Sequence, residues 1–204
     1  MFGYGACHVN EAHIAINKMK STLNYRGFTV VELMIALAMA AIFASLALPS
    51  FVVTVRQTRL ATTGDLLNAD LLVARDEAIK RNGRVYVCPV GPQNDGTCGT
   101  DFTAWAGGWL VCYDVDNKTG CNKPAAASTD PNPIVNRGPL DPSVALNGPS
   151  SAVQFNSDGT QAANTNLDFT ITGTWSGSNA TGSAYFVASV APSGNISLKK
   201  KLAP

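Results

Sequence analysis

One long apolar segment constrains this chain more than any other part of its sequence. Residues 30–55 read VVELMIALAMAAIFASLALPSFVVTV and contain a single charge, on Glu32. About 20 consecutive apolar residues form a helix long enough to cross the hydrocarbon core of a bilayer. Basic residues that precede such a run hold its N-terminal side in the cytoplasm, and here they are Lys18, Lys20 and Arg26. We therefore expect a single-pass transmembrane helix over residues 28–55, with the rest of the chain beyond the membrane.

Glu32 distinguishes this run from two simpler kinds of apolar segment. A secretory signal peptide would have a shorter apolar core, followed by small residues at its cleavage site. A plain membrane anchor fits the length of the run but leaves the carboxylate unexplained. A charged side chain in lipid costs about 2.5–3.5 kcal/mol at the centre of the bilayer, so it calls for a cationic partner. Glu32 is therefore a candidate functional residue.

The residues around Glu32 carry a specific resemblance. The stretch RGFTVVELMIALAMAAIFASLALPSF resembles the N-terminal signal of type IV prepilins and type II secretion pseudopilins. In that family a prepilin peptidase cuts after the glycine and methylates the new N-terminus. The resemblance implies a cut between Gly27 and Phe28, methylation of Phe28, and pairing of Glu32 with the N-terminal amine of a neighbouring subunit. It also implies a helix kink at Pro49, because a proline removes one backbone hydrogen bond.

The same resemblance makes residues 1–27 a leader peptide. This leader is long for the family, and Met19 begins a second, more usual one with the sequence MKSTLNYRG. We expect translation to start at Met19, and a genuine long leader is the alternative. Once the leader is removed, small residues permit close packing of the helix against other pilin helices. These residues are Ala36, Ala38, Ala40, Ala41, Ala44, Ser45 and Ala47.

Residues 56–83 are expected to form an amphipathic continuation of the same helix. Apolar residues recur on one face at helical spacing, and they are Leu60, Leu67, Leu71, Ala74 and Ala78. Charged residues are assigned to the other faces, and they are Arg56, Arg59, Asp70, Arg75, Lys80 and Arg81. Asn82 and Gly83 favour the left-handed conformation that ends a helix.

Residues 84–204 are expected to form a periplasmic, β-rich globular domain. Short runs of strand-forming residues bounded by turns predict six or seven strands, at 84–88, 109–115, 143–146, 152–156, 167–172, 183–190 and 196–199. Residues 91–108 and 122–142 are rich in Gly, Pro, Asn and Thr and are interpreted as loops. The predicted fold class is α+β, with a long N-terminal helix packed on an antiparallel β-sheet.

Four further motifs extend the resemblance over nearly the whole chain after the leader. They read LLVARDEAIKRNGRVYVC, GGWLVCYDVDNKTG, VQFNSDGT and AYFVASVAPSGNISLKK. Together they are similar to the H-type pseudopilins and to the FimT and FimU minor pilins. This similarity implies the pilin fold and a structural subunit of a type II secretion pseudopilus or a type IV pilus.

Four cysteines follow the apolar run, and they are Cys88, Cys98, Cys112 and Cys121. An even number of cysteines after an export signal predicts two disulfides in an oxidising compartment. A zinc site is the alternative, but its ligands usually come as close pairs, and these cysteines are separated by ten, fourteen and nine residues. Three pairings are open, of which Cys88 with Cys98 and Cys112 with Cys121 would close short loops.

Catalysis and cofactor binding are not expected. Both histidines, His8 and His13, lie in the leader, which excludes histidine-dependent nucleophiles and histidine metal sites from the mature chain. Asp114, Asp116, Asn117 and Gly120 have partial calcium-loop spacing but lack the later ligands, so a hairpin turn is favoured over a calcium site. Core packing is the expected role of at least Trp109 among the three tryptophans.

The resemblance therefore predicts a minor pilin or pseudopilin of the bacterial inner membrane that takes part in filament initiation or assembly and in protein secretion. Its expected partners are other pilins, the prepilin peptidase and the inner-membrane assembly platform. A position at the filament tip is included in this expectation. The alternative is a DNA-binding minor pilin of a competence pilus, with Lys199, Lys200 and Lys201 as phosphate contacts on a basic tail. Asn195 and Ser197 stand where arginines of such pilins are expected, which argues against DNA.

Overall fold

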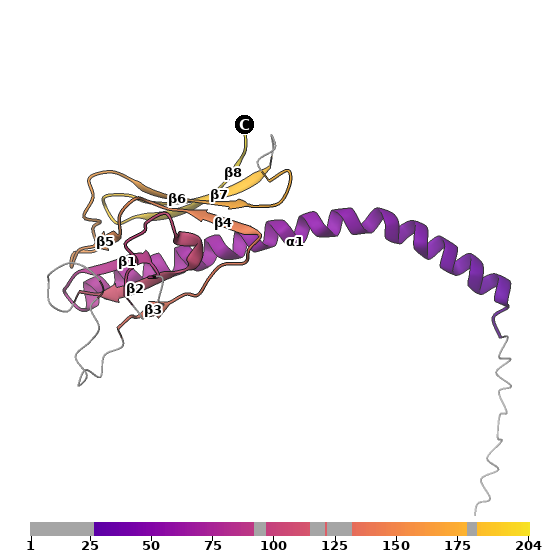
Figure 1. The fold of residues 1–204 in the computed structure, drawn as a ribbon, viewed down its shortest axis with the longest axis horizontal. Coiled ribbons are helices and arrows are strands. Elements are labelled where there is room, and N and C mark those ends of the chain that lie inside the picture. The colour runs from indigo at the N-terminus through magenta and orange to yellow at the C-terminus, as the bar shows by residue number, and fades with distance from the viewer. Residues whose placement is uncertain (1–26, 92–96, 115–120, 122–131, 179–182) are drawn as a thin grey trace, which may run out of the picture. The chain divides into compact units, whose positions relative to one another are not determined.

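A computed structural model of the chain describes residues 27–91, 97–114, 121, 132–178 and 183–204, apart from the side chains of residues 46–50. One long helix and short strands make up these residues, as Figure 1 shows. The chain divides into two compact units at the boundary between Ser45 and Leu46, and each unit is considered by itself.

The helix, α1, runs from Val30 to Lys80. Thr29 caps its N-terminus, because the Thr29 hydroxyl oxygen accepts a hydrogen bond from the backbone N–H of Glu32 at 3.2 Å. At the other end Asn82 takes a left-handed conformation with φ of 48°, and the N–H of Gly83 bonds to the carbonyl of Ala78 at 3.1 Å. The two residues that the sequence singled out as a helix stop therefore lie just beyond the last turn.

Within the described ranges, eight strands form two four-stranded sheets. Strands β1 (Val85–Pro89), β2 (Trp109–Tyr113), β3 (Val135–Asn136) and β5 (Val153–Phe155) form the first, in the order β3-β2-β1-β5. Strands β4 (Val144–Asn147), β6 (Leu167–Gly173), β7 (Ala184–Val190) and β8 (Ile196–Leu202) form the second, in the order β4-β6-β7-β8. All neighbouring strands are antiparallel. A 3-10 turn, η1 (Trp105–Gly107), precedes β2.

The core lies between the second half of α1 and the inner faces of both sheets. The predicted apolar face of the helix is fully buried there, and its members are Leu60, Leu67, Leu71, Ala74 and Ala78. Every residue of β1 is buried, because α1 covers one face of this strand and a second cluster, around the cysteines, covers the other. The predicted α+β fold with a helix on antiparallel strands is confirmed.

One detail of the strand prediction was wrong, because β3 lies in a segment interpreted as a loop. β3 has only two residues, and its pairing with Leu110 and Val111 of β2 defines it. Two residues between prolines and glycines carry no alternating pattern, so neighbouring β2 rather than local sequence makes this segment a strand.

Two turns meet at the C-terminal end of α1. The turn at 157–160 and the β7–β8 turn both contain a glycine with positive φ, 79° at Gly159 and 76° at Gly194. A Cβ atom on Gly194 would collide with the carbonyl oxygen of Gly159, so this approach requires glycine. The same carbonyl accepts a hydrogen bond from Arg75 Nε at 3.0 Å. The turn with the sequence SDG at residues 157–159 is thus hydrogen-bonded to the helix, and the turn with the sequence SGN at residues 193–195 packs against it.

Candidate functional site

The segment predicted to be processed lies at the start of α1. Gly27 and Phe28 precede the helix, and Phe28 is 83% exposed. Thr29 and Glu32 form the Thr-x-x-Glu pattern of a capping box, in which the threonine hydroxyl satisfies an N–H that would otherwise have no partner. The sequence contained this pattern, but the cap had not been predicted. It fixes where the helix begins, two residues after the predicted new N-terminus.

Glu32 is exposed in the first turn of α1. An acidic side chain there interacts favourably with the positive end of the helix dipole. Among the ion pairs within the described residues, none involves Glu32. Within the described residues the carboxylate is thus available to a cation, which is what the predicted pairing with a neighbouring N-terminus requires.

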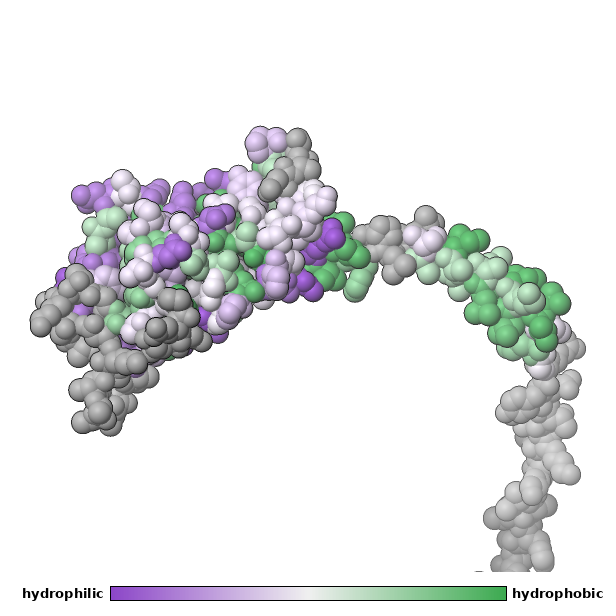
Figure 2. All heavy atoms as spheres, in the orientation of Figure 1, coloured by the Kyte–Doolittle hydropathy of each residue, from purple (hydrophilic) through white to green (hydrophobic). Residues whose placement is uncertain are grey.

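The first half of α1 presents apolar side chains to its surroundings on all sides. Val30, Met34, Leu37, Ile42 and Phe43 are each more than half exposed. Figure 2 shows hydrophobic residues covering this part of the helix. Within the part of the chain that the structure describes, no helical stretch meets the length and apolarity needed to cross a membrane. Pro49 lies within α1 in the segment without described side chains, so the predicted kink stays a prediction.

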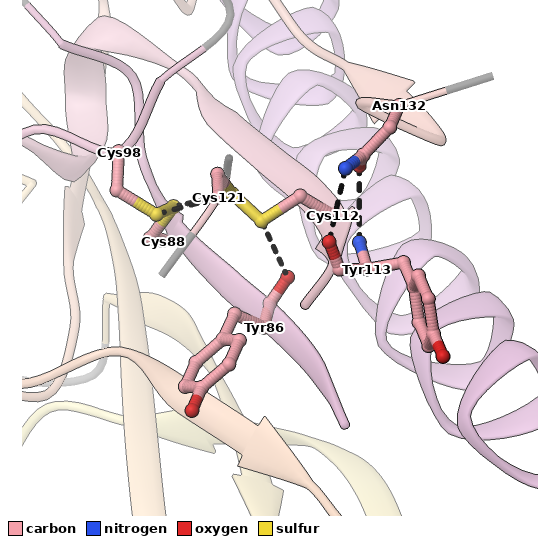
Figure 3. The surroundings of a disulfide bond; sticks show 7 residues. All are labelled: Tyr86, Cys88, Cys98, Cys112, Tyr113, Cys121 and Asn132. Carbon is pink, nitrogen blue, oxygen red and sulfur yellow. Dashed lines mark hydrogen bonds between the residues drawn. A yellow bond between two sulfur atoms is a disulfide. The ribbon is translucent and has the colours of Figure 1, made fainter. Parts of the chain in front are cut away.

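The four cysteines come together on the outer face of the first sheet (Figure 3). Cys88 is bonded to Cys98 and Cys112 to Cys121, with Cα atoms 5.6 and 5.3 Å apart. The bridges touch each other, since the sulfurs of Cys98 and Cys121 are 3.2 Å apart. This is the short-loop pairing among the three that the sequence left open. The bridges and Tyr86 cover strands that would otherwise expose their outer face.

Asp70 is a buried residue that the sequence had assigned to a polar helix face, and this assignment was wrong. It is only 2% exposed. Its carboxylate accepts a hydrogen bond from Trp109 Nε1 at 2.9 Å and two from Arg137, at 2.8 and 2.9 Å. These bonds raise the pKa of Arg137. Asp70 therefore joins α1 to β2 and to the segment after β3.

The partial calcium motif contributes one described carboxylate. Asp114 is buried and forms an ion pair with Arg84 at 3.1 Å. Asp116, Asn117 and Gly120, and with them the predicted hairpin turn, lie outside the described residues. The one placed carboxylate of this motif is thus engaged by a guanidinium group.

The three lysines do not form a tail. Lys199, Lys200 and Lys201 lie within β8, an edge strand, and all three are exposed. The register places them opposite Val187, Phe186 and Tyr185 of β7. Because side chains alternate along a strand, Lys200 points to the opposite face of the sheet from Lys199 and Lys201. A strand is predicted from alternating apolar and polar residues, and three consecutive lysines lack that alternation.

A long helix with an apolar, capped N-terminal half and a domain of antiparallel strands defines the class of protein, that of pilin-like subunits. Two families match the sequence. The prokaryotic N-terminal methylation motif covers residues 22–48, and the family described as type II transport protein GspH covers residues 63–194. The second match spans well over half of the chain, so this protein belongs to the GspH family, as the resemblance implied.

Solved structures add a similarity of fold. The type IV minor pilin FimU of Pseudomonas aeruginosa is 19% identical, covers 70% of this chain and 90% of its own, and has a TM-score of 0.47. The minor pseudopilin EpsH of the Vibrio cholerae type 2 secretion system is 13% identical, covers 69% and 96%, and has a TM-score of 0.46. Among curated proteins, none matches. The family assignment therefore rests on the match to the GspH family and on the match to the N-terminal methylation motif.

Proposed function

We propose that this protein is a membrane-inserted minor subunit of a type II secretion pseudopilus or a type IV pilus, acting in filament initiation or assembly. One observation carries the proposal. The methylation motif and the GspH region lie on the same chain, joined by the single helix α1. An exported domain is thereby attached to the segment through which subunits of this class are processed and assembled.

Processing is proposed to occur after Gly27, with N-methylation of Phe28. The exposure of Phe28 and the start of α1 only two residues later support this. A protease needs an extended segment, and residues 27–29 are not helical.

Assembly is proposed to depend on Glu32. An exposed carboxylate without an ion pair among the described residues would be costly in lipid unless a cation approached it. The methylated amine of an adjacent subunit supplies that cation, and alanines along the helix allow the approach. The assembly platform and the prepilin peptidase complete the proposed set of partners.

The membrane arrangement is proposed as a single pass through the inner membrane, with residues 28–55 in the bilayer and the β-rich domain in the periplasm. The apolar run supports the first part, and the two disulfides support an oxidising compartment for the domain.

The test is the intact mass and N-terminal sequence of the membrane-extracted protein, with and without a co-expressed prepilin peptidase. We expect a peptidase-dependent start at N-methyl-Phe28, and we expect Gly27→Glu to abolish it. Glu32→Gln should still be cut but should no longer co-purify with partner pilins, whereas Asp65→Asn on the same helix should behave like the unmodified protein. An uncut leader in the presence of peptidase, or a cut beyond Pro49, would contradict the proposal.

A further inference from the structure

A cavity lies beside α1 just after the apolar run ends. It has a volume of about 370 Å³ and is lined by Val53 and Arg56 of α1, by Trp175, and by Ser176, Ser178 and Ser183. Arg56 is the first charged residue after Glu32 in the sequence. Small-molecule sites have volumes of roughly 300–1,000 Å³, so this cavity is large enough for a small polar group.

The cavity has the chemistry of an anion site. Arg56 is the one charged side chain among its described lining residues, and the serines add hydroxyl groups. The guanidinium lies 5.4 Å from the centroid of the Trp175 ring, which orients it by a cation–π interaction. None of the ion pairs within the described residues involves Arg56. Within the described residues its N–H donors therefore have no carboxylate to bond, and they are available to an anion in the cavity.

Trp175 is held in place by the packing around it. A Cβ atom on Gly173 would collide with the six-membered part of the indole, so the glycine makes room for the ring. The ring packs against the edge of the core and remains partly exposed. Tryptophan in this half-buried state is typical of the interface between membrane and water, where its ring meets both apolar and polar groups.

The surroundings of the cavity combine apolar and basic groups. Phe51 and Val53 are 68% and 55% exposed on α1. Across the sheet, Ala184 on the cavity wall pairs with Leu202, which is 64% exposed, and Lys200, two residues earlier and on the same face of β8, is also exposed. An apolar rim with one lysine and an arginine beside it matches a bilayer surface, where acyl chains lie next to phosphate groups.

We propose that this cavity binds the phosphate of a phospholipid from the leaflet next to the domain. The phosphate accepts hydrogen bonds from Arg56, Ser176 and Ser178, because the hydroxyl of Ser183 already donates to the carbonyl of Gly177 at 2.7 Å. The acyl chains of the lipid lie along the apolar rim of α1. Arginine suits this role, because its planar guanidinium can bond to two phosphate oxygens at once. The inference rests on the proposed insertion of residues 28–55 into the membrane, and it assigns Lys200, on the same face of β8 as Leu202, to this surface as an auxiliary, salt-sensitive contact.

The test measures lipid binding by the full chain. The protein is extracted in mild detergent and stripped of lipid, dioleoylphosphatidylglycerol is added, and lipids that remain bound are counted by native mass spectrometry. Dioleoylglycerol, which has the same acyl chains without phosphate, is the comparator. We expect one phosphatidylglycerol per chain, and Arg56→Gln should weaken it about tenfold, the effect of losing a charge-assisted hydrogen bond. Dioleoylglycerol should bind equally weakly to both proteins.

Arg59→Gln is the matched control. It removes the same charge three residues along α1, where Arg59 pairs with Asp141 at 3.1 Å away from the cavity lining. We expect its affinity for phosphatidylglycerol to stay within about twofold of the unmodified protein, since exposed ion pairs contribute little. Equal effects of the two substitutions would overturn the inference.

Two competitors separate lipid from other sources of phosphate. Inorganic phosphate or a short duplex DNA that binds with the same dependence on Arg56, and displaces the lipid at comparable concentration, would overturn the assignment to phospholipid. A chain absent from the membrane fraction before extraction would overturn both this inference and the proposed function. If the chain is inserted and processed but Arg56→Gln leaves its affinity for phosphatidylglycerol unchanged, the inference alone is overturned.

Discussion

Asp70 shows how one buried carboxylate can connect segments that are distant in the sequence. It is enclosed between α1 and the first sheet, and its partners are Trp109 and Arg137. A buried carboxylate is tolerated only when donors surround it, and here three N–H groups reach its two oxygens. The helix and both neighbouring segments are thus fixed relative to one another by a single residue.

Removing this carboxylate should destabilise the domain strongly. We expect Asp70→Ala to lower the free energy of unfolding by about 3 kcal/mol, because the Trp109 N–H is left buried without a partner. The measurement is urea unfolding of the full chain in detergent, with tryptophan fluorescence as the signal that reports unfolding. Arg59→Gln, which breaks an exposed pair, should change the same quantity by less than about 1 kcal/mol. A double-mutant cycle of Asp70 with Arg137 that shows no coupling would refute this account.

The sequence predicted some residue roles and missed others for definite reasons. Leu60, Leu67 and Leu71 were predicted as core because their spacing repeats along one helix face. Asp70 lies beside that face, but its partner Arg137 is 67 residues away, and no local pattern reports such a pairing. The cavity residues Arg56 and Trp175 are also far apart in the sequence, so only the folded chain places one above the other.

At the scale of elements, the two disulfides act on the first sheet. β1 is buried on both faces, and the bridges supply the cover on the side away from α1. Since Cys88 and Cys112 lie on adjacent strands, each bridge also fixes a loop to the sheet. The number of cysteines predicted bridges, but the choice among three pairings needed the strand register.

Peptide mapping under non-reducing conditions should recover Cys88 with Cys98 and Cys112 with Cys121. The double substitution of Cys112 and Cys121 by serine should lower the free energy of unfolding by roughly 2–4 kcal/mol, because a short closed loop then opens in the unfolded chain. Cys7→Ser is the control, since Cys7 lies in the predicted leader and should leave the processed protein unchanged. Recovery of Cys88 linked to Cys121 would show a different pairing.

At the scale of the whole molecule, several carboxylates should make the domain sensitive to acid. Hydrogen bonds from the hydroxyl and N–H of Thr160 lower the pKa of Asp158, and those of Ser143 lower the pKa of Asp141. A hydrogen bond from Arg81 lowers the pKa of Glu77. A carboxylate with a lowered pKa in the folded state contributes stability above its unfolded value of about 4, and this contribution disappears as the pH falls through the folded pKa.

We therefore expect the urea midpoint of unfolding to be steady from about pH 7 to pH 5 and to fall below about pH 4. Because neutral hydroxyl donors are the largest cause for Asp141 and Asp158, high salt should leave most of this fall in place. Thr160→Val should bring the pKa of Asp158, measured by NMR, back toward its ordinary value. A midpoint that rises in acid would contradict this assignment of charges.

Strand β8 has a consequence for how these subunits meet. Among the strands that the structure describes it pairs with β7 alone, so the other side of its backbone directs N–H and C=O groups toward any further extended chain. Two such edges from neighbouring copies would bring six lysine charges together, and charge on an edge strand is a known protection against sheet-to-sheet aggregation. The charge on β8 should therefore keep neighbouring copies from joining through their sheets, which agrees with the proposed association through the long helix.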